Sequence, residues 1–196
     1  MNHSIPNTPS IGNQNLTVRA FVDTADMQAQ KLYSSGMDLF TNHQFACALE
    51  KFEEAVKIEQ NSFKLWMAKG HTHLALDQFL PALESFERAL SLDKTLSILW
   101  EGKGQALLGL KQFRKAIHAF DQAIIYRIVS STAWAGKGYG HYLLKEYNEA
   151  LTAFQEAIEK DPNNLSAWKG KANVYYRMRN YKEATKAYKK ALLAKH

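Results

Sequence analysis

Several features that decide fold or location in other proteins are scarce in this sequence of 196 residues. There is one cysteine, Cys47, so no internal disulfide framework can form and an oxidising compartment gains no support. No run of about 18 or more apolar residues occurs, so the sequence predicts no membrane-spanning helix. Residues 1–15 lack the basic start and the apolar run of a secretory signal. These absences predict a soluble, cytoplasmic protein.

Turn-forming residues are also few, and the net charge is unevenly distributed. Four prolines and ten glycines suit helices better than a loop-rich β fold. Hydrophobic residues make up 46% and charged residues 22% of the chain, so disorder of the whole chain is not expected. The net charge is +6, yet residues 165–196 alone carry +8, from nine Lys and Arg residues against Glu183. The basic character therefore belongs to the C-terminal end.

What the sequence does contain is a repeat with a period of 34 residues. The four tryptophans mark it with equal steps, at Trp66, Trp100, Trp134 and Trp168. A glycine series keeps the same step at Gly36, Gly70, Gly104 and Gly138, with Ala172 as its fifth member. Aromatic and alanine series follow it: Phe45, Phe79, Phe113, Tyr147 and Tyr181; Ala48, Ala82, Ala116, Ala150 and Ala184; Phe52, Phe86, Phe120, Phe154 and Tyr188; and Ala55, Ala89, Ala123, Ala157 and Ala191.

Helix packing gives the physical reason for these series. Ala82, Phe86 and Ala89 sit at i, i+4 and i+7, which is one face of an α-helix. The small residues let a neighbouring helix approach, and the aromatic residues fill the space between layers. A glycine inside a helix costs about 1 kcal/mol relative to alanine, so the recurrence of Gly104 and its equivalents indicates that a side chain would collide with the partner helix. Each period predicts two helices joined by a short turn such as Lys111-Gln112.

The order Trp, Gly, Ala, Phe, Ala and Pro at these spacings resembles the tetratricopeptide repeat. The resemblance implies an all-α fold, a right-handed α-solenoid of five tandem helix-turn-helix repeats. The repeats are expected at residues 29–62, 63–96, 97–130, 131–164 and 165–196, which together form one domain at 29–196.

The sequence departs from the family pattern at a few positions. Leu32 stands where the first repeat would have its tryptophan, and terminal repeats are expected to be atypical because they cap the stack. The closing proline is present only as Pro162. We expect residues 1–28 to be a polar, disordered N-terminal segment, in which residues 16–28 form either a short capping helix or a flexible lead-in.

No catalytic or metal-binding set emerges from the residues. His71 and His73 are two positions apart, so on a helix they point in different directions, whereas a zinc pair needs a spacing of three or four. The segments Gly102-Lys103-Gly104 and Gly136-Lys137-Gly138 lack the full spacing and the preceding strand of a phosphate loop. We therefore predict no enzymatic activity, no metal and no cofactor.

A lysine series follows the same period at Lys69, Lys103, Lys137 and Lys171. One interpretation is a ladder of cations that recognises an acidic partner. The favoured interpretation is that each lysine stem packs beside a tryptophan while its ammonium group reaches water.

The resemblance also implies a protein-binding groove, because the first helices of the family line the concave side of the stack. Exposed methionine and tyrosine residues there would suit an adaptable peptide site. The alternative is that the apolar members Phe40, Leu74 and Leu108 pack between neighbouring helices. The family's inner positions correspond to Tyr33, Met37, Phe40, Met67, His71, Leu74, Glu101, Gln105, Leu108, Tyr139, Tyr142, Lys169, Asn173 and Tyr176.

Members of the family that bind chaperone C-terminal carboxylates use a clamp of basic and amide residues across three repeats. Counted from the third repeat, the clamp positions hold Glu101, Gln105, Gly136, Ser166 and Gly170. Counting from the first or the second repeat gives no better match to the clamp. The count from the second repeat includes Thr132. The required Lys, Asn and Arg set is absent, so binding of a chaperone carboxylate is disfavoured.

Basic residues gather near and on the expected last helix, at Arg177, Arg179, Lys182, Lys186, Lys189 and Lys190. One interpretation is a surface for nucleic acid or another acidic surface. The favoured interpretation is a solvated end cap, since the last repeat has no neighbour and no aromatic residue interleaves on the lysine face to stack bases.

The main functional hypothesis is a non-catalytic protein–protein interaction scaffold that holds a peptide or helix of a partner in the groove, as a monomer or weak dimer. Nucleic-acid binding through the basic C-terminal repeat is the alternative, and it is not favoured. A secretion-type chaperone is a further alternative, disfavoured because such members commonly have three repeats.

Overall fold

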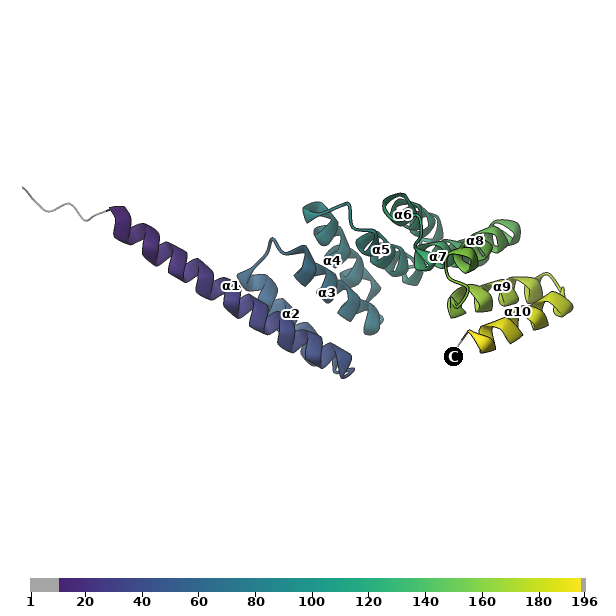
Figure 1. The fold of residues 1–196 in the computed structure, drawn as a ribbon, viewed down its shortest axis with the longest axis horizontal. Helices are drawn as coiled ribbons and strands as arrows, with labels where there is room; N and C mark the ends of the chain where they lie inside the picture. The colour runs from purple at the N-terminus through teal and green to yellow at the C-terminus, as the bar shows by residue number, and fades with distance from the viewer. Residues whose placement is uncertain (1–10, 195–196) are drawn as a thin grey trace, which may run out of the picture. The chain divides into compact units, whose positions relative to one another are not determined.

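The structure is a computed structural model that describes residues 11–194, with side chains described for Thr24 and for residues 26–194. Over these residues the chain forms ten α-helices and no strand (Figure 1). The all-α class of tandem helical repeats predicted from the sequence is confirmed. The helices are α1 (Ile11–Thr41), α2 (Phe45–Ile58), α3 (Phe63–Ala75), α4 (Phe79–Leu92), α5 (Ser97–Gly109), α6 (Phe113–Tyr126), α7 (Ser131–Leu143), α8 (Tyr147–Lys160), α9 (Leu165–Arg177) and α10 (Tyr181–Leu193).

The helices divide into two compact units, Met1–Asn61 and Ser62–His196. In the first unit, α1 packs against α2. The helix α1 runs without a break from Ile11 to Thr41, so residues 16–28 are part of one long helix instead of a separate cap or lead-in. The segment expected to be disordered is therefore helical from Ile11 onward, and residues 1–10 lie outside the described residues.

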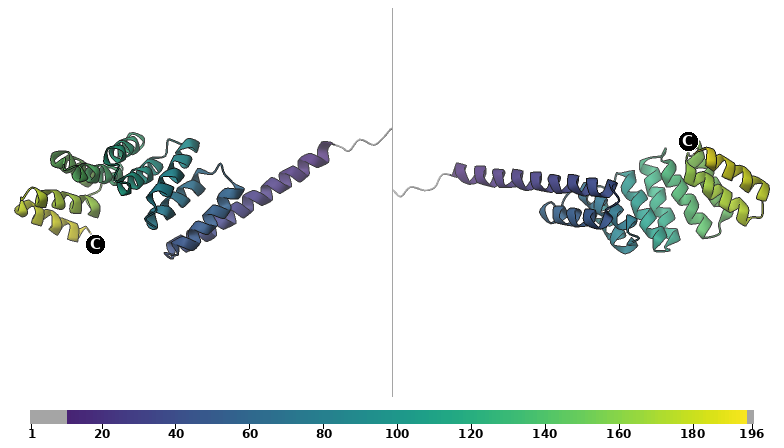
Figure 2. Two further views of the ribbon diagram at one scale, coloured as in Figure 1. Left: turned by 180° about the vertical axis from the view of Figure 1, so that it is seen from behind. Right: turned by 90° about the horizontal axis from the view of Figure 1, so that it is seen from below.

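The second unit is a stack of four helix pairs. The helices α4, α6 and α8 each pack against the first helix of their own repeat and against the first helix of the next repeat, whereas α10 packs against α9. The first helices α3, α5, α7 and α9 also contact one another in succession, as the views in Figure 2 allow the reader to follow. The first helices therefore form a continuous layer, which is where the candidate site lies.

A buried phenylalanine of the second helix lies at the centre of each repeat except the last, at Phe52, Phe86, Phe120 and Phe154. Phe120 is 1% exposed, and its ring lies between a glycine of its own repeat and a glycine of the next. A Cβ atom would come within 2.7 Å of this ring at Gly104 and within 2.5 Å at Gly136. Carbon atoms are in optimal contact at about 3.5–4 Å, so neither position has room for a side chain. The expected collision at the glycine series is confirmed, and the obstacle is the phenylalanine ring of a second helix.

The tryptophans attach each first helix to the loop that precedes it. The indole Nε1–H donates a hydrogen bond to the backbone oxygen six residues earlier, from Trp100 to Lys94 at 2.8 Å, from Trp134 to Ile128 at 3.3 Å and from Trp168 to Pro162 at 2.8 Å. Because the same bond recurs at three junctions, the tryptophan series holds the inter-repeat loops in place.

The lysine series bridges successive repeats. Each Nζ lies 5.3 to 5.8 Å from the centre of a tryptophan ring on its own helix. Such cation–π contacts are worth about 0.5–1 kcal/mol at exposed sites. The ammonium groups also reach the second helix of the preceding repeat, at Lys103–Glu87 (2.8 Å), Lys137–Asp121 (2.7 Å) and Lys171–Gln155 (2.6 Å). These contacts agree with packing as the role of the lysines, and burial lowers the pKa of Lys171.

Each helix pair is joined by a turn whose central residue has a left-handed backbone. In the third repeat, the N–H of Lys111 donates to the carbonyl oxygen of Leu108, and the N–H of Gln112 donates to that of Leu107. This bond pair is a Schellman motif, which favours glycine at the left-handed position. The residues found there are His43, Asp77, Lys111, Lys145 and Arg179, with φ between 55° and 63°.

We expect Lys111→Gly to stabilise the chain. The φ of Lys111 is 58°, and a left-handed conformation costs an L-residue with a side chain roughly 1–2 kcal/mol. Part of that gain is offset by the greater backbone freedom of glycine when the chain unfolds, so urea titration should show an increase of about 0.5–1 kcal/mol in the free energy of unfolding. The control is His118→Gly on the exposed side of α6, where glycine should lower stability by about 1 kcal/mol. A loss of stability in Lys111→Gly would contradict the turn geometry.

Candidate functional site

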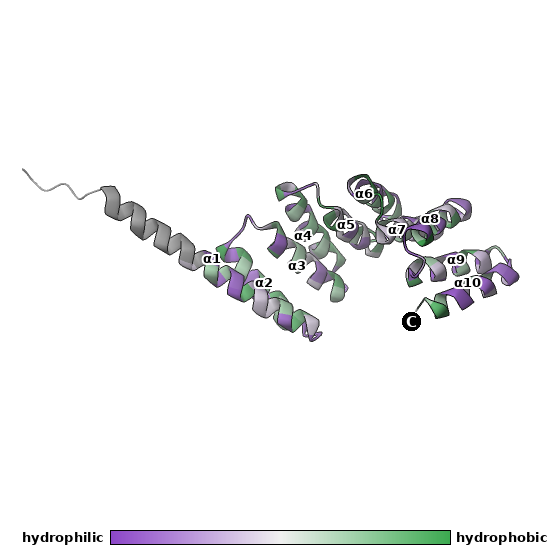
Figure 3. Ribbon diagram, viewed as in Figure 1, coloured by the Kyte–Doolittle hydropathy of each residue, from purple (hydrophilic) through white to green (hydrophobic). Residues whose placement is uncertain are grey.

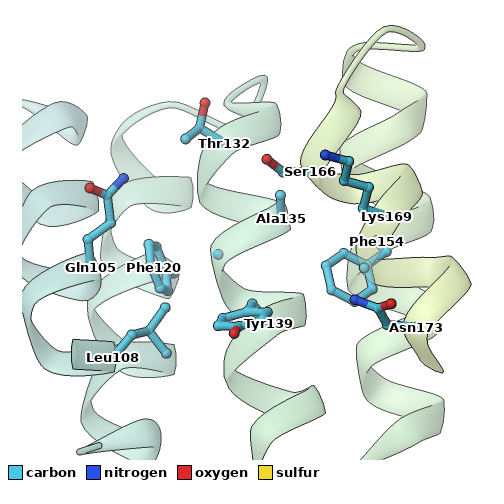
Figure 4. Close-up of a pocket in the computed structure, with 12 residues that line it drawn as sticks. Gln105, Leu108, Phe120, Thr132, Ala135, Tyr139, Phe154, Ser166, Lys169 and Asn173 are labelled. Carbon is cyan, nitrogen blue, oxygen red and sulfur yellow. The ribbon is translucent and has the colours of Figure 1, made fainter. Parts of the chain in front are cut away.

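A groove with a volume of about 350 Å³ opens along α5, α7 and α9 (Figure 4). We call it the α5/α7/α9 groove. The first helices provide its sides, and two second helices contribute the phenylalanine rings of its floor. Its lining residues are Gln105, Leu108, Phe120, Thr132, Ala135, Gly136, Tyr139, Phe154, Ser166, Lys169, Gly170 and Asn173.

The depth of the groove follows from the glycines on α7 and α9. A Cβ atom at Gly170 would overlap the ring of Phe154, so this position stays without a side chain. The same holds for Gly136 above Phe120. The floor is therefore apolar and low. The same glycines that permit helix stacking also create the hollow.

The sides of the groove are polar. The side chains of Gln105, Thr132, Ser166 and Lys169 are exposed around the apolar floor. They come from three successive first helices, at positions that the repeat brings into line. The groove thus combines an apolar base with hydroxyl and amide groups that can both donate and accept hydrogen bonds.

Asn173 has a fixed orientation. The hydroxyl of Tyr188 donates to the Oδ1 atom of Asn173 at 2.5 Å. With its oxygen held in this way, the amide nitrogen lies on the side facing Tyr139, as Figure 4 shows. Tyr139 itself is 44% exposed, and its ring stacks on that of Tyr142 with centres 6.0 Å apart. Asn173 and Tyr139 therefore present an oriented donor and an aromatic face to the same space.

Five of the residues expected to form the groove line it, namely Gln105, Leu108, Tyr139, Lys169 and Asn173. Thr132 and Ser166 line it as well, although they lie outside the expected set. The repeat contains a signal for them, because they are one period apart and both occupy positions compared with the chaperone clamp. Their hydroxyls do not match that clamp, which requires other side chains.

Glu101 is engaged within the structure and does not line the groove. Its Oε1 atom accepts hydrogen bonds from the hydroxyl of Ser97 at 3.0 Å and from that of Ser130 at 2.6 Å. The Ser130 hydroxyl also accepts a bond from the N–H of Ala133 as the N-cap of α7. Glu101 therefore links α5 to the start of α7, and it acts as a positioning residue.

Tyr142 and Tyr176 belong to a tyrosine cluster beside the groove. The Nε–H of Arg177 donates to the hydroxyl of Tyr142 at 3.3 Å, and this bond raises the pKa of Arg177. The ring of Tyr176 meets that of Tyr181 edge-on with centres 5.6 Å apart. Neither Tyr142 nor Tyr176 lines the α5/α7/α9 groove.

On α3, the expected groove residues pack against the core of the second repeat. Met67 and Leu74 are half-buried beside the cluster that contains Phe86. The ring of His71 stands edge-on to Phe86 at 5.0 Å, and burial lowers its pKa. These contacts correspond to the packing alternative for Leu74.

In the first unit, Tyr33 and Phe40 also contact aromatic rings. Tyr33 lies 6.0 Å from Phe52, and Phe40 lies 5.2 Å from Phe45. Met37 is half-buried on the same helix. These contacts correspond to packing within the α1–α2 pair.

Four of the basic residues near the C-terminus lie on α10. Lys182, Lys189 and Lys190 are exposed on α10, which Figure 3 shows as a largely hydrophilic helix. Lys186 is paired with Glu183 at 2.7 Å, and Arg179 is the left-handed residue of the last turn.

Among the described residues, no three His, Cys, Asp or Glu side chains gather closely enough to hold a metal ion. None of the described helices combines the length and apolar character needed to cross a membrane.

Family models described as tetratricopeptide repeat match residues 63–96, 101–164 and 142–196 of the chain. No curated protein matches the chain in sequence.

The fold is similar to that of several solved structures. TTC0263, a thermophilic TPR protein of Thermus thermophilus, is 20% identical over 85% of this chain and 91% of that chain, with a TM-score of 0.74. MamA of Desulfovibrio magneticus RS-1 is 18% identical over 86% and 95%, with a TM-score of 0.73. YrrB, a TPR protein with an unusual peptide-binding site, is 19% identical over 90% and 91%, with a TM-score of 0.66. At these identities the likeness concerns the fold.

Proposed function

The chain belongs to the tetratricopeptide repeat family, and from this premise we propose that it is a non-catalytic scaffold that holds a peptide segment of a partner protein in the α5/α7/α9 groove. The observation that carries the proposal is the apolar floor of Phe120 and Phe154 beneath a rim of amide and hydroxyl groups. Among the similar structures, YrrB has a peptide-binding site, which supports a peptide as the class of ligand.

The rim suits an extended peptide backbone. A peptide offers alternating N–H and C=O groups, and the amides of Gln105 and Asn173 can donate and accept in turn. Thr132 and Ser166 add hydroxyls from the first turns of α7 and α9. A small apolar side chain of the ligand would enter the low floor, and Tyr139 would cover it from the side. Recognition would then come mainly from the backbone and from one or two side chains.

The charge of the groove restricts which peptides it is expected to bind. Lys169 is the one charged residue among the residues that line the groove. We therefore expect the bound segment to carry an acidic or neutral residue opposite Lys169, and a basic residue there to be rejected.

Tyr139→Ala is expected to weaken peptide binding roughly tenfold, because a buried aromatic contact of this kind is worth more than about 1 kcal/mol. The probe is a peptide selected from a random phage-displayed library against the full chain and then labelled for fluorescence anisotropy. Asn173→Ala should have a similar effect, through loss of the oriented amide. The side chain of Tyr139 is half-exposed, so helicity measured by circular dichroism should stay unchanged.

Tyr176→Ala is the matched control, because Tyr176 is an exposed tyrosine on α9 that lies outside the groove. Its affinity for the peptide should stay within about twofold of the wild-type value. Equal weakening in Tyr176→Ala and Tyr139→Ala would place the site in the tyrosine cluster and contradict the groove.

The two alternatives to peptide binding have less support. Nucleic-acid binding would rest on Lys182, Lys189 and Lys190, which face solvent on α10. The exposed ring of Tyr188 on the same helix is already held by its hydroxyl bond to Asn173. Titration of labelled RNA at two salt concentrations should detect no binding at physiological salt, whereas strong binding that Lys189→Glu abolishes would favour this alternative. No specific observation favours the second alternative, a secretion-type chaperone.

A further inference from the structure

The outer face of α10 leaves uncovered the positions that the interior repeats bury. Phe154 on α8 is 1% exposed, but Tyr188 at the equivalent position of α10 is 41% exposed. Ile158 is 7% exposed, and its equivalent, Leu192, is 69% exposed. In the interior repeats, the first helix of the next repeat covers these positions. Among the described helices, none packs on this outer face of α10.

The charge at one position of this face is reversed relative to the interior. At three junctions, a lysine of the next repeat bonds to an acceptor sixteen residues earlier, which is Glu87, Asp121 or Gln155. The equivalent position on α10 holds Lys189. A further helix with the lysine of this repeat would place two ammonium groups against each other, which is unfavourable.

We propose that the face formed by Tyr188, Lys189 and Leu192 docks a helix of a partner protein that carries an aspartate or glutamate opposite Lys189. The same helix would carry glycine or alanine opposite Tyr188, because the interior rings tolerate no side chain at the equivalent of Gly170. Leu192 supplies the apolar contact beside the charged pair. Tyr188 also holds Asn173 of the groove through its hydroxyl, but Lys189 and Leu192 lie outside the groove lining, and the inference does not rest on peptide binding there.

A second copy of the chain fits this face poorly. Two α10 helices related by symmetry would bring together the side that carries Lys182, Lys186 and Lys189, and like charges oppose such contact. Stacking of another copy's α3, α5, α7 or α9 would set a lysine of the series against Lys189. Stacking of another copy's α1 would place Ser35 opposite Lys189 and Ser34 opposite Tyr188, which supplies neither a carboxylate nor a glycine or alanine. A nucleic acid would satisfy Lys189 and stack on the exposed ring of Tyr188, but it would leave Leu192 in water. A carboxylate-bearing protein helix satisfies both features at once.

The test uses the full chain extended by one helix. A copy of residues 161–177 is joined after Ala194, so that the repeat continues in register. The residue copied from Lys171 is kept as lysine or changed to glutamate, and each form is made with Lys189 and with Lys189→Glu. We expect the combinations with opposite charges to melt roughly 2–4 °C above those with like charges. The difference should shrink in high salt.

The direction of the difference in melting temperature decides whether the proposal stands. A preference for glutamate with Lys189 that reverses to lysine in Lys189→Glu supports the proposal. Absence of any coupling between the two positions overturns it, because the added helix then does not occupy the face. The matched control is Lys64→Glu, an exposed lysine on α3, which should show no coupling.

Two further measurements separate the other occupants. Sedimentation of the unextended chain should show no association through α10. A dimer that Leu192→Glu dissociates would assign the face to a second copy and overturn the proposal. RNA binding that Lys189→Glu abolishes would overturn it in favour of nucleic acid. Loss of peptide binding in the Tyr139→Ala variant does not change the melting, sedimentation or RNA-binding results expected for α10. Failure at the groove and failure at α10 are therefore distinguishable.

Discussion

Phe120→Ala is expected to lower the free energy of unfolding by about 4 kcal/mol. The ring is 1% exposed and fills the space between Gly104 of its own repeat and Gly136 of the next, so its removal leaves a cavity that two helix backbones border. Because stability in repeat proteins is largely a sum of repeat and interface terms, the loss should affect both the third repeat and its junction with the fourth. Urea titration followed by tryptophan fluorescence measures the change.

Tyr126→Ala is the control for this prediction. Tyr126 is an aromatic residue on the same helix, and it is 41% exposed. Its removal should cost well under half as much as the removal of Phe120. Similar losses in the two variants would contradict the central position of the Phe120 ring.

Gly136→Val is expected to cost about 3 kcal/mol, because overpacking a filled interior forces neighbouring groups to move. The first added atom would already lie 2.5 Å from the Phe120 ring. A smaller ring-site residue should relieve the clash, so the double variant Gly136→Val with Phe120→Leu should lose less stability than the two single variants together. The same urea titration measures this coupling. Thr132→Val, on the exposed side of α7, is the control and should change stability by less than about 0.5 kcal/mol.

If the two losses simply add, Gly136 and Phe120 do not contact each other, and the packing described for the repeat is wrong. The comparison also bears on the groove, since both residues line it. A valine at position 136 would occupy the floor and should weaken peptide binding in any variant that still folds.

The helical stack could be predicted from the sequence because its cause is periodic. A contact that recurs once in every repeat leaves the same residue type at each recurrence, as Trp100 and Gly104 do. The packing of Lys103 beside Trp100 was predicted from the same register. Its second partner, Glu87, was not, although the acceptors on the second helices also follow the period. That series mixes Glu, Asp and Gln, so its common property is the ability to accept a hydrogen bond and not a residue type.

The groove could be predicted only in part, because some of the hydrogen bonds that engage its expected residues occur in one repeat and leave no recurring residue type. Glu101 was expected to face a ligand, but the hydroxyls of Ser97 and Ser130 both bond to its carboxylate. Nothing in the spacing of these three residues shows that they converge. Similarly, the long helix that begins at Ile11 was not anticipated, since residues 11–28 lie outside the repeat and share none of its recurring positions.

The most direct test is a chemical-shift map of the full ¹⁵N-labelled chain titrated with a peptide selected against it. If the α5/α7/α9 groove holds the ligand, the largest shifts should fall on the backbone amides of Thr132, Tyr139, Ser166, Lys169 and Asn173. Shifts confined to α10 would contradict peptide binding in the groove. Shifts at Trp134 and Lys137 with these five amides unchanged would contradict it as well.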